Sequence, residues 1–186
     1  MNKRSSRIFS MLLMASAATF SVSSAAVSAD EGGAALVAQD DQKPRDVSLF
    51  HLAKKGLALG GYDPVAYFPE GGGKAKKGSK KIESVHDGVR YRFSSEKNRK
   101  LFEKNPAHYE PALGGWCPNS LATRNELVAP NHKNFLIQDG RLMVFAKGWF
   151  ANGRSAWQKN KPSELILKAD RYWARRLETR QGQTRF

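Results

Sequence analysis

Two stretches of the chain alternate apolar and polar residues on either side of an Asp-Gly pair. They are residues 81–85 and 89–93 around Asp87-Gly88, and residues 135–138 and 141–145 around Asp139-Gly140. Both residues of an Asp-Gly pair tolerate a positive φ, which a tight hairpin turn requires. The pattern therefore predicts two β-hairpins. A short apolar run at residues 64–68 predicts a further buried strand.

Helical spacing of apolar residues predicts three helices. The first covers residues 45–55 and ends before a glycine. The second is capped by Ser94 or Ser95 and runs through Glu103, after which an Asn-Pro pair stops it. The last starts at Ser163 and presents one apolar stripe opposite a strongly basic face. That stripe consists of Ile166, Ala169, Trp173 and Leu177.

Together these elements predict one α+β domain over residues 45–178, in which helices pack on a small antiparallel sheet. A chain of 186 residues is long enough for one proper core, and no internal repeat divides it. Residues 30–44 are acidic and rich in alanine and glycine, which predicts a disordered leader. Residues 179–186 are predicted to form a flexible tail.

The first 29 residues have the pattern of a secretory signal peptide. Basic residues at the start precede an apolar run that is too short to span a bilayer, and Val27-Ser28-Ala29 reads as a cleavage site. We therefore expect a mature protein that is periplasmic or secreted. No later apolar stretch is long enough to cross a membrane, so we expect no transmembrane span in the mature chain.

The formal net charge of +14 is unevenly distributed. One cluster is a Gly-rich loop that contains Lys74, Lys76, Lys77, Lys80 and Lys81. A second cluster, at helical spacing near the C-terminus, comprises Arg171, Arg175, Arg176 and Arg180. Nucleic acid is disfavoured as a partner, because an exported chain rarely meets it. The remaining readings are a solvated face that keeps the protein soluble, or a surface for anionic lipid, envelope polymer or an acidic protein.

The only cysteine, Cys117, follows Gly114-Gly115-Trp116 and precedes Pro118. One cysteine cannot form an intramolecular disulfide, so the thiol is an inert buried group, a reactive group, a metal ligand or the site of an intermolecular pairing. A helix starting at Pro118 would lower the pKa of the thiol and favour its reactive form. We expect a partly accessible Cys117 in an aromatic-lined pocket.

A metal site needs further ligands, and none of the four histidines is at the spacing of a helical site. His108 is the best partner for Cys117, because only a short bend separates the two residues. A Cys/His pair suits copper or zinc as a bound cofactor. Met143 could add a thioether, although a methionine in an alternating strand is more often part of the core.

Asp63 lies between hydrophobic neighbours and directly before a proline. An aspartate at that position commonly accepts backbone N–H groups in a turn. The sharper hypothesis is that it helps to line a small ligand pocket near Cys117. The candidate pocket residues are Tyr62, Asp63, Tyr91, Tyr109 and Trp116. Aromatic residues in a small core would give the same pattern.

Four motifs in a fixed order resemble the YHS-domain family. They are Tyr62-Asp63-Pro64 within GGYDPVAYF, Tyr91-Arg92-Phe93-Ser94, Asn105-Pro106 with Tyr109, and Gly114-Gly115-Trp116-Cys117. The resemblance covers most of residues 56–175 and is closest to the exported single-domain branch, the YHS domain-containing (seleno)proteins. In that branch selenocysteine can stand at the position of Cys117, which implies a role for the sulfur or selenium atom of this residue. The chain departs from the family pattern directly after Cys117, where Pro118-Asn119 replaces the usual small, alanine-rich segment.

Two functions from different classes follow. The first is an exported, non-enzymatic binding protein for a soft metal or small ligand near Cys117, or for an envelope partner. The alternative is a thiol-dependent redox enzyme in which Cys117 would be catalytic. A lone cysteine lacks the resolving partner of a Cys-x-x-Cys oxidoreductase, which favours the first.

Overall fold

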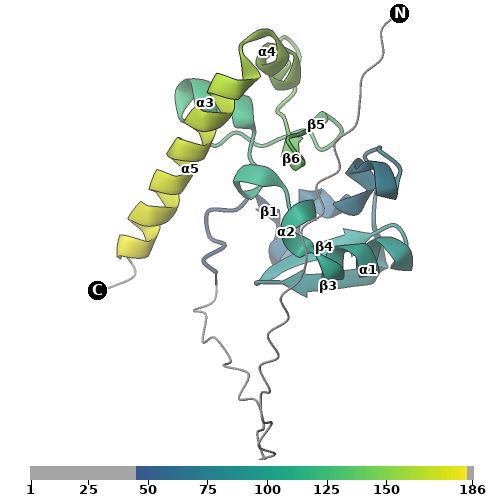
Figure 1. Cartoon of the computed structure of the whole chain (residues 1–186). Coiled ribbons are helices and arrows are strands. Elements are labelled where there is room, and N and C mark those ends of the chain that lie inside the picture. Colours follow the sequence, from purple (N-terminus) through teal and green to yellow (C-terminus); the bar gives the residue numbers. More distant parts are fainter. Residues whose placement is uncertain (1–44, 184–186) are drawn as a thin grey trace, which may run out of the picture. The chain divides into compact units, whose positions relative to one another are not determined.

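The computed structural model describes residues 45–183, and both predicted hairpins are confirmed (Figure 1). β3 (Ser79–His86) pairs antiparallel with β4 (Val89–Phe93), and β5 (Phe135–Gln138) pairs antiparallel with β6 (Arg141–Val144). Both residues of each Asp-Gly pair have a positive φ, as the turn chemistry requires.

The larger sheet has four strands in the order β1-β2-β4-β3. The two added strands are short: β1 (Leu52–Ala53) pairs antiparallel with β2 (Leu57–Ala58). β2 then runs parallel to β4, with Leu57 opposite Arg90. The α+β class is thus confirmed, with a mixed sheet in place of the purely antiparallel one that we expected.

The helix predicted at residues 45–55 is wrong. The Asp46 carboxylate accepts the N–H of Ser48, and the N–H of Phe50 bonds back to Val47, so this segment begins as turns. It continues through β1 into a 3-10 turn at Lys54–Gly56, in which Lys55 has a φ of 62°. Backbone pairing with the sheet has overridden the apolar spacing.

The strand predicted at residues 64–68 is also wrong. The segment forms a 3-10 helix at Val65–Tyr67, all of whose residues are buried. Asp63 accounts for this, because its Oδ1 accepts the N–H groups of Val65 and Ala66 at 2.9 and 3.3 Å. A side chain that bonds the next backbone amides favours a turn over an extended strand.

The helix after the first hairpin is confirmed as α1 (Glu96–Lys104). The Ser95 Oγ caps it by accepting the N–H of Asn98 at 3.2 Å. A short helix, α2 (Pro106–Tyr109), follows directly. α1 packs against β3 and β4 and against the 3-10 helix Val65–Tyr67, and so covers the larger sheet.

The C-terminal part is helical, with α3 (Pro118–Arg124), α4 (Gly153–Lys159) and α5 (Pro162–Gln183). α5 packs against α3 and is tied to β6 by Arg141, which donates two hydrogen bonds to Asp170 at 2.7 and 2.8 Å. α5 continues to Gln183, so residues 179–183 are helical where the sequence indicated the start of a tail.

The buried residues form two clusters. The first is the sheet cluster, which includes Tyr67, Tyr91, Phe93 and Phe102. The second is the helix cluster, in which Cys117, Leu121, Met143, Phe145, Trp157 and Ala169 are all 0 % exposed. β6 contributes to both clusters, because its side chains alternate between them.

The predicted signal peptide, residues 1–29, and the predicted leader, residues 30–44, lie outside the described residues. Among residues 45–183, no helix combines the length and hydropathy that crossing a bilayer requires.

Candidate functional site

Cys117 lies at the N-cap of α3, as the sequence indicated, but it is not accessible. Its side chain is 0 % exposed within the helix cluster, so the prediction of a partly accessible thiol is wrong. Gly153 covers it closely, since a β-carbon at that position would lie 3.2 Å from the Cys117 Sγ. Its backbone is also fixed, because the N–H of Cys117 donates to Val128 O.

His108 does not join Cys117 in the structure. Its ring packs on Phe68 and Tyr109, with 4.7 Å between ring centroids in each pair, and its Nε2 lies 3.6 Å from Glu70. These neighbours belong to the sheet cluster and its edge, whereas Cys117 belongs to the helix cluster. Within residues 45–183, no group of three or more His, Cys, Asp or Glu residues could hold a metal ion.

Asp63 has the structural role of a turn former. It is 0 % exposed, and its Oδ2 accepts hydrogen bonds from the N–H and Oγ of Ser94 and from Asn98 Nδ2, at 2.7 to 2.8 Å. Together with the bonds to the amides of Val65 and Ala66, these donors satisfy both carboxylate oxygens. The side chain therefore joins α1 to the 3-10 helix.

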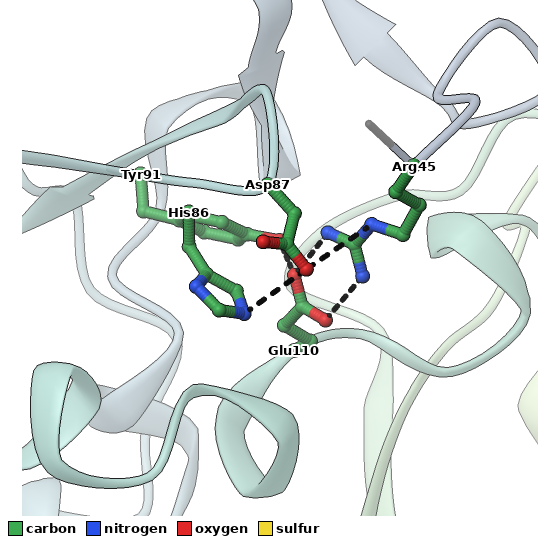
Figure 2. Close-up of polar contacts among 5 residues, drawn as sticks. All are labelled: Arg45, His86, Asp87, Tyr91 and Glu110. Atoms are coloured by element: carbon green, nitrogen blue, oxygen red, sulfur yellow. Dashed lines mark hydrogen bonds and ion pairs between the residues drawn. The ribbon is translucent and has the colours of Figure 1, made fainter. Parts of the chain in front are cut away.

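Tyr91 takes part in a cluster of charged groups that the sequence analysis missed (Figure 2). Its hydroxyl donates to Glu110 Oε1 at 2.6 Å, and Arg45 donates two hydrogen bonds to the same carboxylate at 2.7 and 2.8 Å. At the hairpin tip, Asp87 lies 4.0 Å from Arg45 Nε and 3.5 Å from His86 Nε2. The cluster joins the first described residues to α2 and β4.

The electrostatics of this cluster favour an ion pair. Burial alone would raise the pKa of Glu110, but the hydrogen bonds from Arg45 and Tyr91 outweigh it, and the pKa is lowered from its ordinary value. Burial first, and then the Glu110 charge, raise the pKa of Tyr91 well above the ordinary tyrosine range. Glu110 is thus a fixed carboxylate, and Tyr91 stays a neutral hydrogen-bond donor.

The remaining candidate pocket residues each have a packing partner. The Tyr109 hydroxyl donates to Glu70 at 3.0 Å, and Trp116 Nε1 donates to Leu49 O at 2.6 Å. Tyr62 lies under Lys77, whose Nζ is 4.1 Å from the ring centroid. None of the pockets described below is lined by any of the five predicted residues.

A second feature that the sequence did not reveal is the contact between His51 and His132. Their ring centroids are 5.9 Å apart, and the His132 ring stacks on Tyr62. His132 Nε2 is buried without a hydrogen-bond partner. Burial, followed by the proximity of His51 and of Lys77, lowers the pKa of His132 to about 4. No motif spacing connects positions 51 and 132, so only the fold could bring them together.

The basic cluster near the C-terminus divides into tied and free side chains. Arg176 donates to Asn125 Oδ1 at 2.9 Å, and Arg180 Nε lies 3.8 Å from Asp46. Lys168, Arg171 and Arg175 are exposed on α5, and their side chains make no hydrogen bond or ion pair with any described residue. We call these three side chains the basic face of α5.

Two concave pockets adjoin this basic face. One, of about 400 Å³, is lined by Arg175 together with Arg176, Arg180, Tyr172 and Asn125. The other, of about 440 Å³, is lined by all three side chains of the basic face together with Thr123 and Tyr172. Guanidinium groups and hydroxyls that line the same concave surface suit phosphate or carboxylate oxygens.

The lysine-rich loop contributes less. The Lys77 side chain already has partners within the fold, because its Nζ donates to Gly60 O at 2.7 Å and lies over the Tyr62 ring. Lys74, Lys76, Lys80 and Lys81 are exposed, but they line none of these pockets.

Comparison of the chain with protein-family models, with curated proteins and with solved structures finds no match. The likeness to the YHS-domain family stays a prediction from the four motifs. In this structure the residues of those motifs form turns, caps and packing contacts, as described for Asp63, Tyr91, Tyr109 and Trp116.

Proposed function

We propose that this is an exported, non-enzymatic binding protein that associates with anionic surfaces of the cell envelope through the basic face of α5. The observation that carries the proposal is the set of unpaired cations Lys168, Arg171 and Arg175 beside two concave pockets. Unpaired cations on one helix face attract phosphate-bearing or carboxylate-bearing surfaces, and the net charge of +14 adds a long-range attraction of the same sign.

The burial of Cys117 supports a binding role over the thiol-dependent redox alternative. A thiol must reach its substrate as the thiolate, and the Cys117 side chain is 0 % exposed among apolar side chains. A soft-metal site at Cys117 has weaker support than the basic face, because His108 packs on Phe68 and Tyr109 of the sheet cluster and does not join Cys117. The proposal therefore places recognition on α5 and gives Cys117 a packing role.

Vesicle co-sedimentation tests the proposal. The mature protein should bind vesicles that contain anionic phospholipid, and the bound fraction should fall as salt is raised, because the Debye length shortens from about 30 Å at 0.01 M to about 8 Å at 0.15 M. Vesicles of neutral phosphatidylcholine are the control. Equal binding to neutral and anionic vesicles, or binding that salt does not weaken, would overturn the proposal.

A further inference from the structure

The most exposed apolar surface lies at one loop tip between β6 and α4. Trp149 is 94 % exposed and Phe150 is 97 % exposed. The other large exposed hydrophobic side chains of residues 45–180 are Val85 at 62 % and Leu167 at 65 %. Two adjacent aromatic side chains so fully in water are unusual for a side-chain class that normally supplies core area. We call this pair the aromatic tip.

The fold holds the aromatic tip in place at its base. The N–H of Gly148 donates to Ala151 O, and the N–H of Gly153 donates to Ala146 O, both at 2.9 Å. Asn152 fixes the exit from the loop, because its Oδ1 caps α4 and also accepts a hydrogen bond from Asn134 Nδ2 at 3.0 Å. Two aromatic rings are therefore presented to solvent by a braced turn, which reduces the loss of conformational freedom on binding.

The surroundings of the tip are cationic. Residues 140–163 contain no acidic side chain. Lys147 lies two residues before Trp149, and Lys159 lines a pocket of about 650 Å³ together with Phe150. Both lysines are exposed and make no ion pair with a described residue. An apolar tip with two unpaired lysines near it is complementary to a surface with anionic groups outside and apolar chains beneath.

We propose that the aromatic tip inserts into the headgroup region of an anionic lipid bilayer, so that a bilayer, and not a soluble polyanion, is the partner of this protein. The inference rests on the proposed function, since the basic face of α5 supplies the charge attraction and the tip adds an apolar anchor. Tryptophan suits the bilayer interface because its ring is apolar and its N–H remains hydrated. Phe150 supplies further apolar area at the same point.

The test compares two variants on vesicles of anionic and neutral phospholipid. W149S/F150S should weaken binding to anionic vesicles by about tenfold or more, because transfer of one large aromatic side chain out of water is worth about tenfold in affinity. Its binding to long-chain polyphosphate should match that of the wild type, because the charges are unchanged. V85S removes an exposed hydrophobic side chain elsewhere. It should bind anionic vesicles and polyphosphate as the wild type does.

Fluorescence shows whether the tip enters the bilayer. Vesicles with brominated acyl chains should quench the wild type, and W149F, which keeps an aromatic ring, should bind but lose most of that quenching. If the wild type binds neither anionic vesicles nor polyphosphate, both proposals are overturned. If it binds polyphosphate but not anionic vesicles, the insertion is overturned. Vesicle binding that W149S/F150S leaves unchanged, or that occurs without quenching, overturns the insertion and leaves the charge-based binding through α5 intact.

Discussion

Gly114 lies so close to Trp173 that a β-carbon at position 114 would stand 2.6 Å from Trp173 Cη2. Gly114 belongs to the turn before Cys117, whereas Trp173 is on α5 and also makes an edge contact with Phe50, with 5.7 Å between ring centroids. This contact seats the apolar side of α5 on the turn. The position of the basic face thus depends on the absence of a side chain at position 114.

We expect Gly114→Ala to lower the free energy of unfolding by about 2–4 kcal/mol, because it adds a clash to the strain of an alanine at a φ of 60°. Chemical denaturation measures the effect. The matched control is Gly140→Ala, where φ is 71° and no atom lies within 4 Å of the new β-carbon. If the two variants lose equal stability, the contact with Trp173 is not what requires glycine.

Asp63→Asn should lower the free energy of unfolding by at least about 2 kcal/mol. Five donors surround the carboxylate, and an amide would turn its own NH₂ group toward some of them. Asp139→Asn is the control, because that residue is exposed in a turn that asparagine also tolerates. Near-wild-type stability of Asp63→Asn would show that the buried carboxylate is not needed for the fold.

The lowered pKa of His132 predicts a loss of stability on acidification. The folded protein binds this proton at a pKa of about 4, whereas the unfolded chain binds it near 6.5. The contribution of the neutral His132 to the free energy of unfolding is therefore fully present above about pH 6.5 and is lost as the pH falls toward 4. His51 has the same sign, because burial lowers its pKa.

His132→Gln should flatten the dependence of unfolding free energy on pH between 6.5 and 5, whatever its effect on absolute stability. His108→Gln, which changes an exposed histidine, serves as the comparison. An unchanged slope in the His132 variant would contradict the burial of a neutral imidazole at this position.

Cys117 should react slowly with alkylating reagents in the native protein and at the rate of a free thiol once denaturant unfolds the chain. The reason is its 0 % exposure beneath Gly153. Cys117→Ser should cost about 1–3 kcal/mol, because it places a hydroxyl among apolar side chains. Rapid stoichiometric alkylation without denaturant would return the thiol to the set of reactive candidates.

The parts of the fold that local chemistry determines were predictable from sequence. The Asp-Gly hairpins, the Ser95 cap and the Pro118 helix start depend on residues next to each other in the chain. The strand predicted at residues 64–68 is wrong because the hydrogen bonds from the following amides to Asp63 favour a turn over the strand that the apolar run predicts.

The candidate site was less predictable, because it depends on contacts between distant residues. Cys117 and His108 are close in sequence, yet they pack against different clusters.

The positive charge near the C-terminus was visible in the sequence, but the sequence did not show which cations have no partner. Arg176 is bound by Asn125, and Arg180 by the segment around Asp46, whereas Arg175 has no such partner. The exposure of Trp149 was also hidden, since core tryptophans have the same sequence signal.

The measurement that tests the central claim most directly compares the binding of two charge variants to anionic vesicles. K168Q/R171Q/R175Q removes the basic face of α5, and K54Q/K97Q/K100Q removes the same charge from exposed positions elsewhere. Each cation near an anionic surface contributes about 1 kcal/mol, so the first variant should lose affinity by about a hundredfold or more. The second should lose only the smaller, long-range part. Equal losses in the two variants would show that net charge alone drives binding and would contradict a binding surface on α5.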